Sequence, residues 1–378
     1  MKRAYKMRAY LTRAQEGRAV RLLADHCDLH NAALAERRED WRMGRVRISY
    51  SDQSAQLKEI RATDPEGQGR HSFTAQQQTL RRLNATFAAY LKRAGNMKGN
   101  PRRVGYPRFK PYQRFDQVLF VVGDGARWEP ARGGRWAHAS FQAVGRVKVN
   151  QHRPVLGRVK TLQVKREGRR WYVIVVAETD PVPLAPTGRS VGIDMGVARF
   201  LAAAQERIVD LQRRRARARP GSGNRRRLRQ ALAKQWRKVR NQRRDFHHQT
   251  ARALVDTCDT LALETFRVAA MTKSASGSVQ HPGRNVAAKA GLNRSILDAG
   301  WTQFTSILAA KAESAGRRVV LVNPTHTSID CHACAARCTR PRQDTVVCPV
   351  HGALDADLNG ARNIAIRAGL GSGQASAA

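Results

Sequence analysis

The C-terminal part of the sequence contains a pattern of metal-ligating residues. Two cysteines spaced Cys-x2-Cys are followed, after thirteen residues, by a Cys-x2-His pair. The four residues are Cys331, Cys334, Cys348 and His351. Two such pairs can surround one ion with four sulfur and nitrogen ligands, as in closed tetrahedral zinc sites. Since no coordination position is left for a substrate, the pattern predicts a structural Zn²⁺ ion. Cys338 lies between the pairs, and either Cys338 or His351 would supply the fourth ligand.

A second candidate site consists of acidic residues at the ends of apolar segments. Asp194 ends a short apolar strand, and Glu264 interrupts another apolar segment. Asp355 and Asp357 precede the start of a predicted helix. Each acid alone is typical of a surface, capping or ion-paired residue. Acids are scarce in this chain, however, and three of them at the ends of core elements require a compensating cation. Carboxylate oxygens suit Mg²⁺, and a pair of such ions serves in-line displacement at a phosphodiester.

The segments around these acids predict an α/β scaffold. The expected strands cover residues 190–194, 200–204, 207–209, 260–265 and 318–322. The expected helices cover residues 213–244 with a break at 220–223, 245–258 and 295–315, and a Gly- and Ser-rich loop covers 274–291. Short apolar strands alternating with long helical patterns are typical of an α/β domain.

The beginning of the chain predicts a small helical module. Residues 4–11 alternate like a strand, and the capping box Thr12–Gln15 predicts the start of a helix. Apolar residues then repeat with helical spacing, and a second helical pattern follows Thr74. We therefore expect a basic helical module over residues 12–94.

A β module follows. The expected strands cover residues 118–122, 136–149 and 162–177. The turn Glu167-Gly168 between two segments rich in Val and Trp is typical of a hairpin. We expect a small barrel within residues 100–182, followed by a stiff proline-rich linker at 180–186.

The charge of the chain indicates its partners. There are 69 Lys and Arg against 29 Asp and Glu, a formal net charge of +40 over 378 residues. A folded protein with this excess repels itself unless a polyanion neutralises it, which favours nucleic acid over a membrane surface. No run of 18 or more apolar residues predicts a transmembrane helix, and the N-terminus is not typical of a secretory signal. Six cysteines, four of them clustered, indicate a reducing cytoplasm.

Two segments concentrate the positive charge. Between Arg213 and Arg244, 15 of 32 positions are Lys or Arg and none is acidic, so phosphate contacts are favoured over a solvated face. Residues 96–115 combine Lys and Arg with Tyr106, Phe109, Tyr112 and Phe115. Aromatic rings among cations suit nucleic acid, because bases stack on the rings while cations contact phosphates. The alternative is a linker whose aromatic residues anchor it to a neighbouring core.

Several motifs follow one another in a fixed order. They are Gly192–Gly196, Leu263-Glu264, Gly291–Trp301, the two metal-binding pairs and Asp355–Ile364, preceded by Asn31–Arg37 and Tyr106–Lys110. This order closely resembles the TnpB family, transposon-encoded relatives of the type V CRISPR effectors. The resemblance covers nearly the whole chain.

The resemblance implies an RNA-guided DNA endonuclease whose RNase H-like (RuvC) domain is interrupted by a zinc knuckle. The family's three catalytic carboxylates correspond to Asp194, Glu264 and Asp357, with Asp357 favoured over Asp355 by the spacing of the following asparagines. They would hold two Mg²⁺ ions, which Mn²⁺ could replace. His351 stands where the family usually has a fourth cysteine.

The resemblance also implies a multidomain α+β fold and its boundaries. The expected parts are the first strand of a wedge β-barrel at 1–11, a helical recognition module at 12–99, the wedge β-barrel at 100–182, the first part of the RuvC-like domain at 183–328, a zinc-binding module at 329–352, the last part of the RuvC-like domain at 353–368 and a flexible tail at 369–378. The implied partners are a guide RNA from the transposon end and double-stranded target DNA, without a membrane. We expect one protein chain per RNA, in a prokaryotic cytoplasm near the nucleoid.

Two residues, Tyr50 and Gln77, lie near the positions of family residues that read a short DNA motif, and we expect them to contact nucleic acid. Further contacts are expected from arginines of the basic hairpin, namely Arg213, Arg214, Arg225, Arg226, Arg237 and Arg240. Two other functions stay open, namely a DNA-binding repressor or RNA chaperone whose acids hold only structural ions, and a strand-transferring transposase. Catalytically dead relatives lack part of the acid set, whereas this sequence keeps all three acids.

Overall fold

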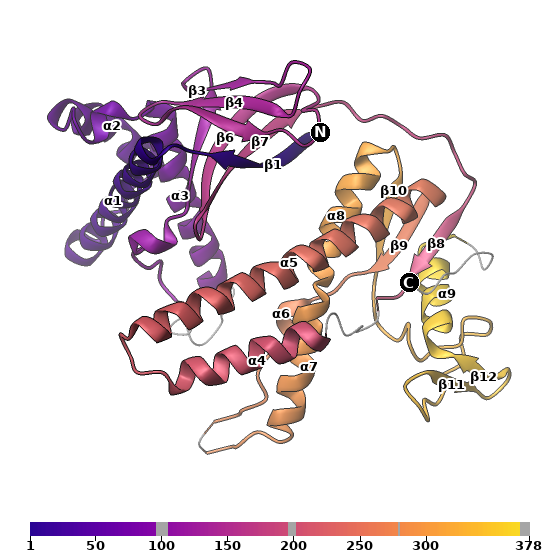
Figure 1. Cartoon of the computed structure of the whole chain (residues 1–378). Helices are drawn as coiled ribbons and strands as arrows, with labels where there is room; N and C mark the ends of the chain where they lie inside the picture. The colour runs from indigo at the N-terminus through magenta and orange to yellow at the C-terminus, as the bar shows by residue number, and fades with distance from the viewer. Residues whose placement is uncertain (96–104, 196–201, 279, 371–378) are drawn as a thin grey trace. The chain divides into compact units, whose positions relative to one another are not determined.

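The computed structural model of the 378-residue chain describes residues 1–95, 105–195, 202–278 and 280–370. It divides into two compact units, Met1–Asp180 and Pro181–Ala378. Each unit combines helices with a β-sheet, so the chain has the expected multidomain α+β architecture (Figure 1). Within the described ranges, no helix is both long and apolar enough to span a membrane.

The first unit contains a closed seven-stranded barrel with the order β1-β5-β4-β3-β2-β6-β7. Its strands are β1 (Lys2–Tyr10), β2 (Gln117–Val122), β3 (Gly125–Glu129), β4 (Trp136–Phe141), β5 (Gly145–Asn150), β6 (Arg158–Glu167) and β7 (Arg170–Glu178). The strand at the start of the chain pairs with β7, from Lys2 opposite Glu178 to Ala9 opposite Trp171. This long-range pairing closes the barrel and leaves no free sheet edge.

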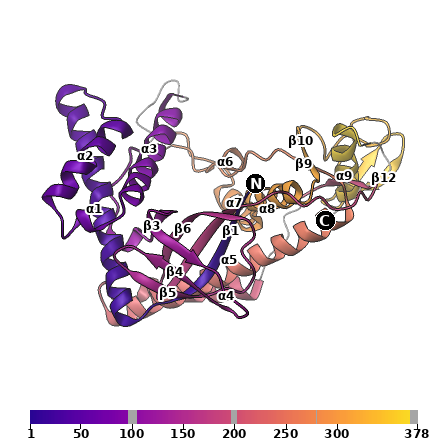
Figure 2. The ribbon, with the colours of Figure 1, turned by 90° about the horizontal axis from the view of Figure 1, so that it is seen from above.

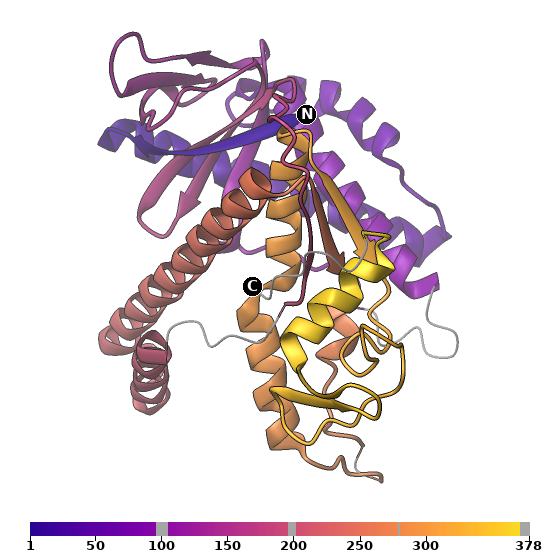
Figure 3. The ribbon, with the colours of Figure 1, turned by 90° about the vertical axis from the view of Figure 1, so that its right-hand side faces the viewer.

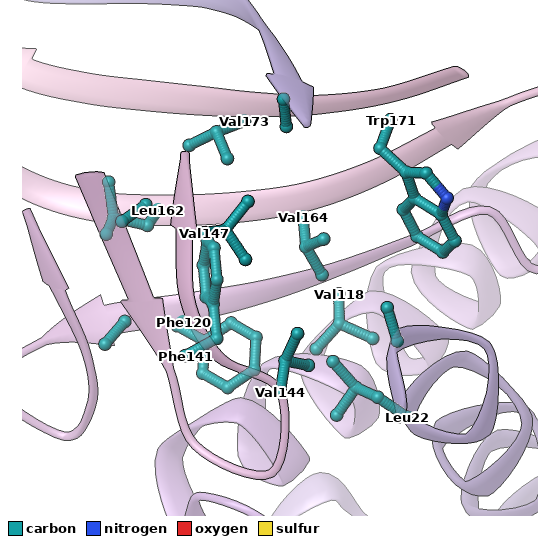
Figure 4. Packing of buried hydrophobic residues seen from close by; sticks show 14 of the residues in the cluster. Leu22, Val118, Phe120, Phe141, Val144, Val147, Leu162, Val164, Trp171 and Val173 are labelled. Atoms are coloured by element: carbon teal, nitrogen blue, oxygen red, sulfur yellow. The ribbon is translucent and has the colours of Figure 1, made fainter. Parts of the chain in front are cut away.

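Alternating apolar residues fill the barrel, as Figure 4 shows. Phe120, Leu162 and Val173 are fully buried because every second residue of these strands points inward. Leu22 of α1 (Arg13–Gly44) joins this core near Val118 (Figure 4). The helix therefore packs against the barrel through one apolar face.

The helical part of this unit has its own small core. It consists of α1, α2 (Tyr50–Thr63) and α3 (Phe73–Gly95), with short 3₁₀ turns at Gln68–Arg70 and Tyr112–Arg114. Leu34, Leu57 and Leu83, one from each helix, are fully buried together. The predicted capping box is confirmed, since Thr12 Oγ1 accepts from the Gln15 N–H at 3.2 Å and Gln15 Oε1 accepts from the Thr12 N–H at 3.0 Å.

The second unit is built on a parallel sheet with the order β10-β9-β8. Its strands are β8 (Ser190–Ile193), β9 (Thr260–Glu264) and β10 (Arg318–Val322). Leu261 and Leu263 pack against α5 (Gly223–Thr257) and α8 (Trp301–Ser314), whereas Ala262 faces α9 (Ala356–Arg367). Helices therefore cover both faces, and Figure 3 shows α8 and α9 on opposite sides of the strands.

The other elements of this unit extend from that sandwich. They are α4 (Ala202–Arg217), α6 (Val268–Met271), α7 (Val286–Ala299) and the antiparallel pair β11 (Thr345–Cys348) and β12 (Gly352–Asp355). The helices α4 and α5 form the predicted hairpin, with Leu211 of α4 packed against Leu228 and Leu232 of α5. The β11–β12 pair contacts α9 (Figure 2).

Four predictions in this unit are wrong. The segments 202–204 and 207–209 are helical rather than strands, because Ile208 and Leu211 form the helical stripe that packs on α5. Residues 200 and 201 lie outside the described ranges. The expected loop at 274–291 ends earlier, since α7 begins at Val286 among strong helix formers. The helix expected at 295–315 is interrupted at Gly300, which adopts a left-handed conformation with φ 69°.

Gly192 is expected to be essential for the second unit. A methyl group added there would lie 2.7 Å from the backbone nitrogen of Ala365 in α9, which is closer than contacts allow. We expect Gly192→Ala to lower the free energy of unfolding by about 1–3 kcal/mol, measured by chemical denaturation, because α9 must move away. Gly223→Ala is the control, since no atom lies within 4 Å of its added methyl group. Equal stabilities of the two variants would contradict the close packing of α9 on β8.

Candidate functional site

Asp194 and Glu264 lie side by side at the carboxyl edge of the parallel sheet. In the register of β8 and β9, Ile193 is opposite Leu263, so the two acids occupy the next position on neighbouring strands. Both line one pocket of about 840 Å³. The loop that follows β10, including Thr327, forms another wall of this pocket. The parallel register thus brings together two acids that are 70 positions apart in the sequence.

Asp357 approaches from the first turn of α9. Asp355 is the N-cap of this helix and accepts from the Leu358 N–H at 2.8 Å, whereas Asp357 is exposed in the first turn. One turn later, a methyl group added to Gly360 would lie 2.6 Å from Asp194 Oδ2. The beginning of α9 therefore lies against the Asp194 carboxylate, and the capping role of Asp355 leaves Asp357 as the available acid.

The three acids interact electrostatically. Burial and the negative charges of Glu264 and Asp357 raise the pKa of Asp194 to about 6, against the smaller opposing effect of Arg340. Burial also raises the pKa of Glu264, although its hydrogen bond from Thr327 opposes the shift. Asp357 does not line the pocket, and the three carboxylates form no close ligand group among the described residues. The negative charge at this edge is thus incompletely compensated by the protein.

A buried hydrogen-bond network holds the wall of the pocket in place. The Thr327 hydroxyl donates to Glu264 Oε1, and Asn363 Nδ2 donates to the Thr327 carbonyl at 2.9 Å. The side chains of Asn359 and Asn363 both donate to the carbonyl of Asp330, at 2.9 and 2.6 Å. These positions were not predicted as site residues, although the i,i+4 spacing of the two asparagines places them on one face of α9. They fix the loop that orients Glu264.

The four predicted metal ligands converge in the β11–β12 region. The sulfur atoms of Cys331, Cys334 and Cys348 and a ring nitrogen of His351 all lie within 4.8 Å of one another. His351 Nδ1 is 3.6 Å from the sulfur atoms of both Cys331 and Cys348. All six cysteines of the chain are free thiols. A soft metal ion fits this set of three sulfurs and one nitrogen.

Cys338 lies outside this ligand group, and its thiol donates to the carbonyl of Ala336 at 3.7 Å. The group is joined to α9 through His332, whose backbone N–H donates to Asn359 Oδ1 at 3.0 Å. The geometry therefore favours His351 over Cys338 as the fourth ligand.

The two positions predicted to read a DNA motif lie on the face between α2 and α3. The guanidinium of Arg81 stacks 5.3 Å from the ring centroid of Tyr50, whose hydroxyl is buried without a hydrogen-bond partner in the structure. Gln77 Nε2 donates to Ser54 Oγ at 3.0 Å. Both side chains are partly buried, so they contribute to the packing of α2 against α3.

The predicted arginines of the α4–α5 hairpin differ in their surroundings. Arg213, Arg214, Arg226 and Arg240 are exposed, and Arg237 is half-buried. Arg214 pairs with Asp210 at 3.7 Å, four positions earlier in the same helix. Arg225 instead closes the hairpin, because its guanidinium donates to the Ala218 carbonyl at 3.0 Å. The hairpin is therefore a basic surface in which Arg225 also has a structural task.

The raised pKa of Asp194 predicts how stability depends on pH. Because its folded pKa of about 6 exceeds its ordinary value of 3.8, protonated Asp194 stabilises the fold below about pH 4, and this contribution disappears as the pH rises through 6. In magnesium-free buffer, we expect Asp194→Asn to gain about 2–3 kcal/mol over the wild type between about pH 4.5 and pH 7.5. Chemical denaturation of both proteins across this range measures the gain. Parallel stability profiles would contradict the shift, and Asp355→Asn should retain the wild-type profile.

Two family models match parts of the chain. Residues 198–275 match a family model described as "Probable transposase", and residues 301–364 match one described as "Cas12f1-like, TNB domain". Among solved structures, the chain aligns with a Cas12f1–sgRNA–target DNA complex at 13% identity and a TM-score of 0.30, over 96% of this chain and 98% of that one. A CRISPR–Cas12f ternary complex aligns at 14% identity and a TM-score of 0.32, over 92% and 81%. Such low TM-scores carry no conclusion.

The curated relatives are closer in sequence. A protein of Streptomyces pristinaespiralis named "Putative RNA-guided DNA endonuclease" is 28% identical over 392 residues, covering 98% of this chain and 90% of that protein. "Putative RNA-guided DNA endonuclease InsQ" of Escherichia coli K12 is 30% identical over 353 residues, covering 88% of this chain and 84% of InsQ. Since this similarity spans most of both sequences and accompanies the ordered motifs, the chain belongs to the TnpB family of transposon-encoded RNA-guided DNA endonucleases.

Proposed function

We propose that this protein cleaves DNA matched to a transposon-derived guide RNA, by hydrolysing phosphodiester bonds at a RuvC-type site made of Asp194, Glu264 and Asp357. The observation that carries the proposal is the raised pKa of Asp194, buried against two further carboxylates in a chain of net charge +40. Burying Asp194 beside two other carboxylates lowers the stability of the fold. Such a cost indicates that the carboxylates bind a cation or take part in catalysis.

The donor set fits magnesium. All three side chains offer hard carboxylate oxygens, and the uncompensated charge around Asp194 would be neutralised by divalent ions. Asp194, Glu264 and Asp357 would hold these ions, with Mn²⁺ as a substitute. When bound there, the ions would supply Lewis-acid activation of water and stabilisation of the leaving 3′ oxygen.

The residues of the chain itself prepare the site for this chemistry. Thr327 orients Glu264 through its hydroxyl, so the carboxylate does not need to be ordered when the substrate arrives. Phe266 and Met271 line the pocket with apolar surface, and Arg267 brings to it a cation that would pair with a substrate phosphate. Asp357 is exposed and meets the incoming strand. This arrangement supports hydrolysis of a backbone that enters along the sheet edge.

We assign a structural Zn²⁺ ion to Cys331, Cys334, Cys348 and His351, in a module inserted between β10 and α9. The closed set of four ligands excludes a substrate, and the buried core of the module is small, with cysteines as three of its five buried residues. The ion therefore stabilises the segment that leads from Thr327 into α9.

The remaining parts would hold nucleic acid. The helical recognition module and the wedge barrel would bind the structured RNA and the guide–target duplex through shape and phosphates, leaving sequence to base pairing. The α4–α5 hairpin would contact phosphates through its exposed arginines. Tyr50 and Gln77 would read a short DNA motif beside the target, and one chain would act on each RNA.

Cleavage of matched DNA tests this function. The protein is purified with its copurifying RNA, the RNA is sequenced, and plasmids with and without a matching target are incubated with Mg²⁺. We expect Asp194→Asn to slow cleavage by about a thousandfold, because loss of a metal ligand forfeits several kcal/mol of transition-state stabilisation. Asp355→Ala is the matched control, since removing this helix cap should cost about 1 kcal/mol of stability and leave cleavage intact.

Unchanged cleavage by Asp194→Asn would overturn the assignment of the site. Guide-dependent binding without cleavage by the wild type would instead identify a repressor. Joined DNA ends among the products would identify a strand-transferring transposase.

The zinc assignment predicts distinct metal contents for two cysteine variants. We expect one equivalent of zinc in the wild type and in Cys338→Ser, and a loss of bound zinc in Cys348→Ser. The reason is that, of these two cysteines, Cys348 belongs to the group of four ligands and Cys338 does not. Elemental analysis of the purified proteins by mass spectrometry measures this. His351→Ala should bind zinc more weakly than the wild type. If Cys338→Ser lost its zinc while His351→Ala kept it, Cys338 would be the fourth ligand.

A further inference from the structure

A second pocket lies in the first unit, far in sequence from the acid site. It has a volume of about 490 Å³, within the range of pockets that accept a single small ligand. It lies between the C-terminal end of α1 and the extended segment 105–109. The lining residues are Arg38, Trp41, Arg42, Arg45, Gly105, Tyr106, Pro107, Arg108 and Phe109. Four arginines and three aromatic residues thus surround one cavity that no acidic side chain lines.

The extended segment is fixed at both ends, to α1 at one end and to α3 at the other. Asn31 of α1 donates to the carbonyl of Lys110 and accepts from its N–H, both at 2.9 Å. At the other end, the ring of Tyr106 contacts those of Phe87 and Tyr90, with centroids 5.5 and 5.2 Å apart. The pocket is therefore preformed rather than created by a mobile loop.

The arginines of the pocket have no acidic partner. In the part of the chain that the structure describes, none of the guanidinium groups of Arg38, Arg42, Arg45 and Arg108 forms an ion pair. All four side chains are exposed, and Trp41 keeps 40% of its surface exposed beside them. A large aromatic surface exposed among unpaired cations is typical of a binding site for anionic, flat ligands.

Arg45 occupies an unusual position. It caps the C-terminal end of α1 in a left-handed conformation with φ 55°, where glycine is the favoured residue. Its guanidinium lies 5.5 Å from the ring centroid of Trp41. An arginine kept at a position that favours glycine indicates that its side chain has a task.

We propose that this pocket binds one unpaired nucleotide, whose base stacks on Trp41 while its phosphate contacts Arg45 and neighbouring arginines. A duplex cannot place a base on the Trp41 ring, because its bases are stacked on one another. An acidic peptide would use the arginines but not the indole ring. The proposal rests on the proposed nucleic-acid-guided function, of which it specifies one contact, and both RNA and DNA contain the required chemistry.

Photo-crosslinking tests the position of this contact. The full-length Asp194→Ala variant, which keeps any DNA intact, is mixed with 12-nucleotide oligouridine RNA or oligothymidine DNA carrying one 5-iodouracil, or with a duplex of the same length. We expect crosslinks within residues 38–45 or 105–109 for one or both single strands and none there for the duplex. The RNA and DNA arms distinguish the two sources. Crosslinks elsewhere only, or equal crosslinking by the duplex, would overturn the proposal.

Affinity measurements separate the base contact from the phosphate contact. At about 0.3 M salt, the attraction of loosely held phosphates is screened. Under this condition we expect Trp41→Ala to bind the single strand about tenfold more weakly, with no change in the slope of log affinity against log salt. Arg45→Gly should lower the slope of log affinity against log salt by about 0.7 and leave thermal stability unchanged or higher. Met43→Ala is the control and should keep the affinity of the parent protein, since Met43 is exposed in the same helix but does not line the pocket.

Wild-type affinity in both pocket variants would contradict the proposal. Equal binding of a polyglutamate peptide at this site would indicate an acidic protein partner instead, and would also overturn it. Neither result depends on cleavage, because the experiments use the Asp194→Ala protein. Failure of the nuclease assay would leave the pocket unaffected, so the two proposals can fail separately.

Discussion

The carboxylates at the edge of the sheet in the second unit repel one another, and the packing of this unit must overcome that repulsion. Asp194 is enclosed by α9 and lies next to Glu264, so its charged form is disfavoured to the extent that its pKa reaches about 6. Several other acids of the unit have basic partners, as Asp259 does with Arg317 and Asp298 with Arg243. The surrounding elements therefore hold the acid group together against its own charge. Gly192 and Gly360 permit this, because α9 can approach β8 and Asp194 only where side chains are absent.

The residues that hold the acid group also connect it with the Cys3His cluster. The segment from Thr327 to Cys331 contacts Glu264 at one end and supplies a thiol of that cluster at the other. Asn359 and Asn363 fasten this segment to α9, the helix that carries Asp357. The two sites are thus built on one short stretch of backbone, and distortion of either would reach the other through hydrogen bonds already present.

Much of this arrangement could be predicted from the sequence, and the exceptions have physical reasons. The convergence of the three cysteines with His351, the Thr12 capping box and the strands around Asp194 and Glu264 follow from local patterns. The strand predicted at 207–209 is wrong because a few apolar residues satisfy either period, and only packing against α5 decides for the helix. The tasks of Thr327 and of the α9 asparagines depend on contacts between segments far apart in the chain, which no local pattern contains. The same holds for Asn31, whose bonds to Lys110 join a sequence landmark to the aromatic segment.

The position of α9 has a consequence for how the protein is made. Asp357 follows Asp194 by 163 residues, 357 − 194, and the acid group is complete only when α9 docks on β8. At roughly 5–20 residues per second of synthesis, about 8–30 seconds separate the two acids on the ribosome. The barrel and its helices, which precede Asp180, can fold and meet their polyanion during that interval. A nascent chain therefore acquires the basic surfaces of its first unit well before its acid group is complete.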